Sequence, residues 1–127
     1  APGSKTYGAI SVVIQYLNQI QITNLIPKTA FFPRPRVISA IVKLTRRRSV
    51  PQRVFNFDKF TGFVRGCFAH RRKTFRNNLK GLFGKPQRNL IQQILQRTRV
   101  NPGLRPENLS VSTYVKLANA FHQAHLL

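Results

Sequence analysis

Residues 68–80 read FAHRRKTFRNNLK, and this stretch decides how the rest of the chain is interpreted. Placed on a helix at about 100° per residue, the stretch and its flanks separate into an apolar stripe and a basic strip. The stripe comprises Val64, Phe68, Phe75, Leu79 and Leu82. The strip comprises Arg65, Arg72, Lys73, Arg76 and Lys80, and Arg71 borders the stripe on its other side. The pattern predicts one amphipathic helix that buries one face and presents cations along the other.

Charge favours a nucleic acid as the partner of this helix. The 127 residues contain 22 Lys and Arg but only two acids, Asp58 and Glu107, for a net charge of +20. Internal ion pairs can neutralise little of that charge, so a polyanion such as RNA or DNA is expected to compensate it. Arginine suits phosphate because its planar fork donates directed hydrogen bonds. A solvated basic face without a ligand is the alternative.

The totals limit the other possibilities. This length allows one domain, or one small domain plus a piece of another, and an apolar content of 42% is enough for a core. Cys67 is the only cysteine, so no intrachain disulfide is possible and a reducing compartment is compatible. We expect no membrane partner, because the sequence has no long hydrophobic span. It also has no methionine, so we expect it to begin downstream of its natural start.

The first part of the chain predicts a helix followed by two strands. Ser4 is a plausible N-cap for a helix through about Leu17, with a buried side of Ile10, Val13, Ile14 and Leu17. Residues 20–26 begin with clean alternation and predict a strand, and residues 37–44, rich in β-branched side chains, predict a second. The two strands can pair antiparallel.

The loop between these strands contains FFPRPRV at residues 31–37. Its two prolines fix φ and bias their predecessors to extended conformations, so the loop is expected to be stiff. One of Phe31 and Phe32 could stack on a base, or both could close the end of the sheet.

A change of character at residues 45–51, TRRRSVP, predicts a domain boundary. Asp58 is a plausible cap for a helix that runs from about Lys59 into the central stretch. Residues 90–95 predict another amphipathic helix, and Ser110 is a plausible cap for the last one. Positions 52–127 are therefore interpreted as a small helical domain.

Four stretches, in order, resemble the C-terminal part of the small-subunit ribosomal RNA adenine dimethyltransferases. They are residues 4–12, 31–40, 68–79 and 105–110, and together they extend over nearly the whole chain. The resemblance implies a Rossmann-like domain that depends on S-adenosylmethionine, followed by a helical domain that helps to hold rRNA. Members of the family dimethylate two neighbouring adenines near the 3′ end of small-subunit rRNA.

On that comparison, residues 1–45 resemble the last helix and the final two strands of the catalytic sheet. Residues 46–127 resemble the whole helical domain. The expected fold class is therefore mixed, with the C-terminal remnant of a Rossmann-like α/β methyltransferase sheet, one helix plus a β-hairpin, ahead of a small all-α RNA-binding domain.

The resemblance also implies site residues. The family's phenylalanine that helps to hold the target adenine falls on Phe31, which leaves Phe32 as the packing residue. Ile38 stands where the family usually has an acidic or amide side chain, so a polar contact is expected to be missing there. The candidate RNA contacts are Arg34, Arg36, Arg65, Arg71, Arg72, Lys73, Arg76 and Lys80.

No catalytic or cofactor residue can be assigned. The sequence has no Gly-rich loop after a strand, no acidic residue to hold a cofactor ribose and no motif for the target amine. S-adenosylmethionine is expected to bind the complete protein elsewhere, and this stretch alone is expected to neither bind it nor methylate. No metal is expected, because His122 and His125 lack a third ligand.

Three functions remain open on the sequence alone. The first is the RNA-holding part of a dimethyltransferase, acting as a monomer on the small subunit in the bacterial cytoplasm or, alternatively, in an organelle matrix or stroma. The second is a ribosome-associated RNA-binding protein without catalysis. The third is a basic DNA-binding factor.

Overall fold

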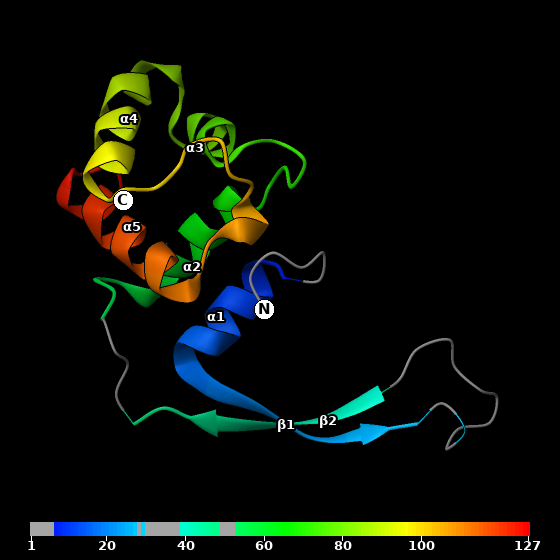
Figure 1. Cartoon of the computed structure of the whole chain (residues 1–127). Coiled ribbons are helices and arrows are strands. Elements are labelled where there is room, and N and C mark those ends of the chain that lie inside the picture. The colour runs from blue at the N-terminus through cyan, green and yellow to red at the C-terminus, as the bar shows by residue number, and fades with distance from the viewer. Residues whose placement is uncertain (1–6, 28, 30–38, 49–52) are drawn as a thin grey trace.

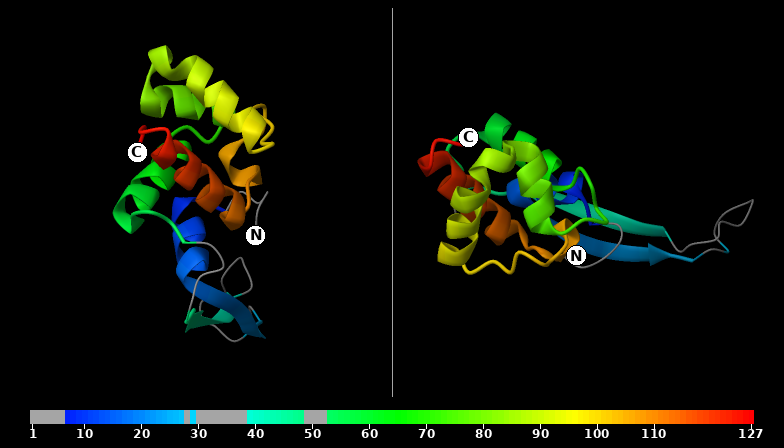
Figure 2. Two further views of the ribbon diagram at one scale, coloured as in Figure 1. Left: turned by 90° about the vertical axis from the view of Figure 1, so that its left-hand side faces the viewer. Right: turned by 90° about the horizontal axis from the view of Figure 1, so that it is seen from above.

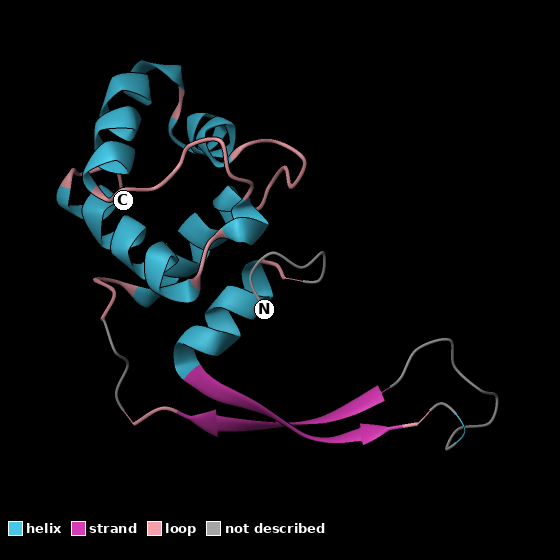
Figure 3. Ribbon diagram, viewed as in Figure 1, coloured by secondary structure: helices cyan, strands magenta, loops and turns pink. Residues whose placement is uncertain are grey.

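The computed structural model describes residues 7–27, 29, 39–48 and 53–127, and it combines helices with a two-stranded sheet (Figures 1 and 3). In chain order the main elements are α1 (Ala9–Leu17), β1 (Asn18–Ile26), β2 (Ser39–Arg46), α2 (Phe57–Cys67), α3 (Phe75–Phe83), α4 (Arg88–Arg97) and α5 (Val111–Gln123). Two short 3₁₀ helices, η2 (Lys85–Gln87) and η3 (Pro106–Asn108), precede α4 and α5. The expected mixed α/β class is confirmed.

The two strands form the antiparallel hairpin that alternation predicted. The register pairs Asn18 with Arg46 at one end and Ile26 with Ser39 at the other. A bulge between Ile22 and Asn24 interrupts it, and the Thr23 hydroxyl donates a hydrogen bond to the Ile41 carbonyl at 3.1 Å. The strands extend further than predicted toward the helices, so β1 begins directly where α1 ends.

The hairpin projects from the helices, as the two views of Figure 2 show. Side chains of large apolar residues are exposed along it, with Leu25 at 68% and Leu44 at 54%. A two-stranded ribbon alone is at best marginally stable in water. No element in the part of the chain that the structure describes buries these apolar side chains.

Helix α1 packs on the helical part through a face that the sequence pattern did not identify. Val12 and Tyr16 are the buried residues of α1, whereas Ile10, predicted to be buried, is 75% exposed. Tyr16 packs against the ring of Phe60, with centroids 5.1 Å apart, and its hydroxyl accepts a hydrogen bond from the Val54 backbone. The predicted face was thus wrong at Ile10, whereas Val13, Ile14 and Leu17 are half-buried and Leu17 packs against the core. The boundary at residues 45 and 46 stays a prediction.

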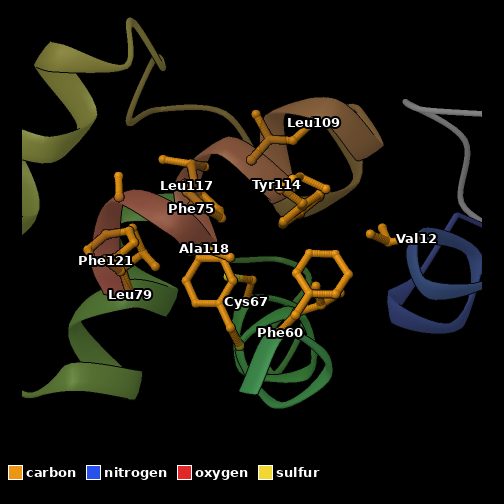
Figure 4. Close-up of a cluster of buried hydrophobic side chains, with 14 of the residues drawn as sticks. Val12, Phe60, Cys67, Phe75, Leu79, Leu109, Tyr114, Leu117, Ala118 and Phe121 are labelled. Carbon is orange, nitrogen blue, oxygen red and sulfur yellow. The ribbon is translucent and has the colours of Figure 1, made fainter. Parts of the chain in front are cut away.

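Helices α2 to α5 enclose an aromatic core (Figure 4). The ring of Phe83 stacks on that of Phe121, and the ring of Phe63 lies tilted against Phe121. Tyr114 lies against Phe68 and Phe75. Side chains cap three of the helices, from Asn56, Thr74 and Ser110. The predicted cap for α2 was wrong: Asn56 accepts the Lys59 N–H, and Asp58 sits in the first turn, where its carboxylate still suits the helix dipole.

The central stretch is not one helix, and this corrects the main structural prediction. Helix α2 ends at Cys67, residues 68–74 form a turn, and α3 begins at Phe75. The predicted basic strip along one flank is therefore divided between two helices and the turn that joins them. Four members of the predicted apolar stripe still face one core, since Val64, Phe68, Phe75 and Leu79 are buried. The stripe was wrong at its fifth member, Leu82, which is 38% exposed.

Candidate nucleic-acid interface

The turn at residues 68–74 is held in shape by the side chain of Asn78. Its Oδ1 accepts the His70 N–H at 2.9 Å, and its Nδ2 donates to the carbonyls of His70, Lys73 and Thr74 at 2.9, 3.4 and 3.1 Å. Asn78 is only 2% exposed. Buried amides stabilise a fold only when their donors and acceptors are paired, and here one amide pairs with both ends of the turn.

Helix α3 is fixed at its first turn by a cap and by a neighbouring segment. The Thr74 hydroxyl accepts the Asn77 N–H at 3.3 Å. The N–H groups of Phe75 and Arg76, which have no partner within the helix, donate to the carbonyls of Leu104 and Pro102. The start of α3 is thus anchored to the segment between α4 and α5, so Arg76 projects from a rigid base.

Arg71 is used within the molecule. Its guanidinium donates to the Tyr7 carbonyl and lies 3.4 Å from Glu107 Oε2, and it sits over the ring of Phe68 at 5.9 Å from the centroid. These contacts join the segment before α1, the central turn and η3. The side chain of Arg71 keeps 41% of its surface exposed, so the ion pair is partly solvated and contributes little by itself.

The other predicted cations of this stretch fall into two groups. Arg72 and Lys73 on the turn and Arg76 on α3 are exposed, and Lys80, half-buried, lies one helical turn after Arg76 on the same face. Arg65, exposed on the last turn of α2, stands apart: with Thr61 it lines a hollow of about 160 Å³ against Ala9, Ile10, Val13 and Ile14 of α1. Four of the predicted cations, Arg72, Lys73, Arg76 and Lys80, therefore lie on the turn and on the helix that follows it, and we call them the turn cluster.

Five residues between positions 31 and 38 to which the sequence analysis assigns roles lie outside the described residues. They are Phe31, Phe32, Arg34, Arg36 and Ile38. Their assignments stay predictions.

The acids are placed away from the turn cluster or are engaged. Asp58 is exposed on the first turn of α2, and Glu107 faces Arg71. Among the described residues, no group of three His, Cys, Asp or Glu side chains could hold a metal ion, and no helix is long and apolar enough to cross a membrane. Burial raises the pKa of the Cys67 thiol well above its ordinary value, which is unlike a reactive cysteine.

Sequence reasoning missed Asn78, the residue that shapes the turn. A signal was present, because threonine directly before Phe75 is a common start of a helix. That signal predicts a break at Thr74, but the partners of Asn78 could not be read from spacing.

The family described as "Ribosomal RNA adenine dimethylase" matches residues 1–123. The chain belongs to this family. Proteins named "Ribosomal RNA small subunit methyltransferase A" from Levilactobacillus brevis and Streptococcus thermophilus are 44% and 38% identical to it over 128 and 127 residues. The alignments include 99% and 98% of this dimethylase chain but only 43% and 44% of those relatives. The chain thus spans less than half the length of these relatives.

Solved structures of rRNA methyltransferases share the fold of this dimethylase chain. A dimethyladenosine transferase from Plasmodium falciparum superposes with a TM-score of 0.73 at 19% identity, over 98% of this chain and 52% of the other. The 23S rRNA methyltransferase ErmE gives 0.68 at 19% identity, over 92% and 47%. The arrangement of one helix, a hairpin and a helical domain is therefore a part of a larger methyltransferase fold.

Proposed function

We propose that this chain is the rRNA-binding C-terminal part of an S-adenosylmethionine-dependent dimethyltransferase that acts on two adjacent adenines of small-subunit rRNA. The turn cluster is the surface that contacts RNA phosphates. Relatives from bacteria support a bacterial setting for the complete protein.

The observation that carries this proposal is the rigid presentation of the turn cluster. Asn78 and the Leu104 and Pro102 carbonyls fix the backbone from which the cations project. A backbone that is already ordered loses less conformational entropy when RNA binds. Arg72, Lys73 and Arg76 have no carboxylate within salt-bridge distance among the described residues, so their charge is available to phosphates.

The transfer chemistry belongs, in this proposal, to a part of the complete protein outside these 127 residues. The relatives are more than twice as long as the part that matches. The exposed apolar side chains of the hairpin fit a surface that a larger sheet would cover. Phe31 would hold the target adenine from the loop between the strands.

The experiment that tests this proposal measures binding of purified small-subunit rRNA by the chain and by the Arg72→Ala and Arg76→Ala variants across a salt series. Each variant should bind more weakly, and the slope of log affinity against log salt should fall by about one unit for each phosphate that is no longer neutralised. Thermal stability should not change, because the described hydrogen bonds involve neither side chain. The control variant is Arg88→Ala, which removes one positive charge at the exposed start of α4, outside the turn cluster. Parent-like slopes in both turn variants would show that the cluster is only a solvated surface.

A further inference from the structure

Helix α4 ends in a conformation that normally requires glycine, yet the residue there is Arg99. The Val100 N–H donates to the Leu95 carbonyl and the Arg99 N–H to the Gln96 carbonyl, the two hydrogen bonds of a Schellman motif. This motif places Arg99 in the left-handed region at φ 59°. Helix α3, by contrast, ends at a glycine, Gly84, with φ 93°.

A non-glycine residue in the left-handed region is strained, because its Cβ crowds the backbone. Such strain persists only where the surrounding structure holds the residue in place, so the strain alone does not identify a site and the surroundings of the residue must decide. Helix α5 provides a comparison within the same chain. It ends in the same pair of hydrogen bonds, from Leu126 to Phe121 and from His125 to His122, with His125 at φ 62°.

Arg99 and His125 differ in their surroundings. Arg99 lines an open groove of about 560 Å³ between the segment that follows α4 and the first turns of α5, and Lys116 of α5 lines the same groove. Both cations are exposed, and none of the residues that line the groove is acidic. Glu107, the nearest acid along the chain, faces Arg71 instead.

The groove also offers neutral donors. Asn101 and Asn108 line it, and each uses its side-chain oxygen to accept a backbone N–H, from Gly103 and Arg105. Each amide NH₂ therefore remains as a hydrogen-bond donor. Two cations with amide donors and without a carboxylate match a phosphodiester, which is anionic and accepts hydrogen bonds only.

The segment that lines the groove is hydrogen-bonded to the first turn of α3, which carries part of the turn cluster. Leu104 lines the groove, and its carbonyl accepts the Phe75 N–H at the start of α3. The carbonyl of Pro102 likewise accepts the Arg76 N–H. A strand of RNA bound at the turn cluster would therefore lie next to the segment that forms the groove.

We propose that the groove lined by Arg99 and Lys116 is a second phosphate-binding site for RNA, separate from the turn cluster. This inference rests on the RNA-binding function proposed above, and it assigns a phosphate contact to Arg99 because Arg99 lines a groove without acids. Arg99 and Lys116 each contact the sugar–phosphate backbone there, and they contribute affinity without reading sequence.

The test uses Arg99→Gly, a variant that relieves strain and removes the cation in one change. Its melting temperature should rise, while its affinity for small-subunit rRNA should fall several-fold near ~0.15 M salt and its salt slope should fall by about one unit. Lys116→Ala should weaken binding in the same way. His125→Gly relieves the same strain outside the groove, so it should raise the melting temperature and leave binding unchanged. Arg88→Ala controls for loss of net charge.

The outcomes separate this inference from the proposed function. If Arg99→Gly binds as tightly as His125→Gly with the same slope, or loses no more affinity than Arg88→Ala, the groove is not a phosphate site. In that case weakened binding by Arg72→Ala and Arg76→Ala would still support the turn cluster. If Arg99→Gly and Lys116→Ala weaken binding but the turn variants do not, RNA binds at the groove and the proposal that the turn cluster contacts RNA is wrong.

Discussion

Asn78 sets the shape of the turn at residues 68–74 although it carries no charge. Its amide makes four hydrogen bonds, and three of them go to carbonyls of the turn and of the helix cap. Arg71 shows the converse, because the sequence presents it as an RNA contact and the structure uses it to join Tyr7 and Glu107. At this scale the hydrogen-bond partners of Asn78 and Arg71, which lie 4 to 64 residues away along the chain, could not be predicted from sequence.

Asn78→Ala should destabilise the fold, because it leaves the buried groups of the turn without partners. Each buried group left unpaired costs about 1–3 kcal/mol, so a loss of at least that size is expected in the free energy of unfolding by urea. Asn77→Ala is the matched control, since Asn77 is exposed and its side chain makes none of the described hydrogen bonds. Equal stability of the two variants would show that the amide does not hold the turn.

Tyr7 predicts how stability depends on pH. Burial raises the pKa of its phenol from 10.0 to about 12. The unfolded chain therefore loses this proton at lower pH than the folded chain. The free energy of unfolding is unaffected by ionisation of Tyr7 below pH 10 and declines as the pH rises toward 12, because the unfolded state is then favoured by deprotonation. Chemical unfolding at several pH values between about 9 and 12 should show a smaller decline for Tyr7→Phe than for the parent. Parallel declines would mean that Tyr7 titrates alike in both states.

At the scale of elements, local patterns predicted the hairpin and misjudged the central helix for a physical reason. Alternation over residues 20–26 has only one good interpretation, and the strands pair as expected. In the central stretch, Phe68 and Phe75 are seven residues apart, which is close to two helical turns. The apolar period therefore continues across the break, so periodicity alone cannot detect a turn between them. The cap at Thr74 and the hydrogen bonds that Asn78 makes to the preceding turn decide the structure instead.

Two glycines near the end of α3 should respond oppositely to alanine. Gly81 lies within the helix, with open space where a Cβ would be, so Gly81→Ala should stabilise the protein by about 0.5–1 kcal/mol. Gly84 has φ 93° and ψ 154°, a region that essentially only glycine occupies. Gly84→Ala should therefore cost about 1–3 kcal/mol. Thermal unfolding of both variants tests this, and a change of the same sign in both would contradict the assigned end of α3.

For the molecule as a whole, the net charge and the exposed apolar side chains of the hairpin support the same function. A chain with net charge +20 repels itself unless an anion compensates, and two acids cannot do so. Its hairpin exposes apolar side chains that the described residues do not cover, and its relatives are more than twice as long as the matching part. Both features are expected of an RNA-holding part of a larger enzyme. The composition predicts a polyanionic partner, whereas the choice of RNA over DNA rests on the family.

The most direct measurement compares binding of small-subunit rRNA and of duplex DNA of random sequence by this chain across a salt series. We predict binding to rRNA at moderate salt, a clear preference for rRNA over the duplex at every salt concentration, and affinities that fall steeply with salt as counterions are displaced. Equal or tighter binding to the duplex, or no binding to rRNA at low salt, would contradict the central claim.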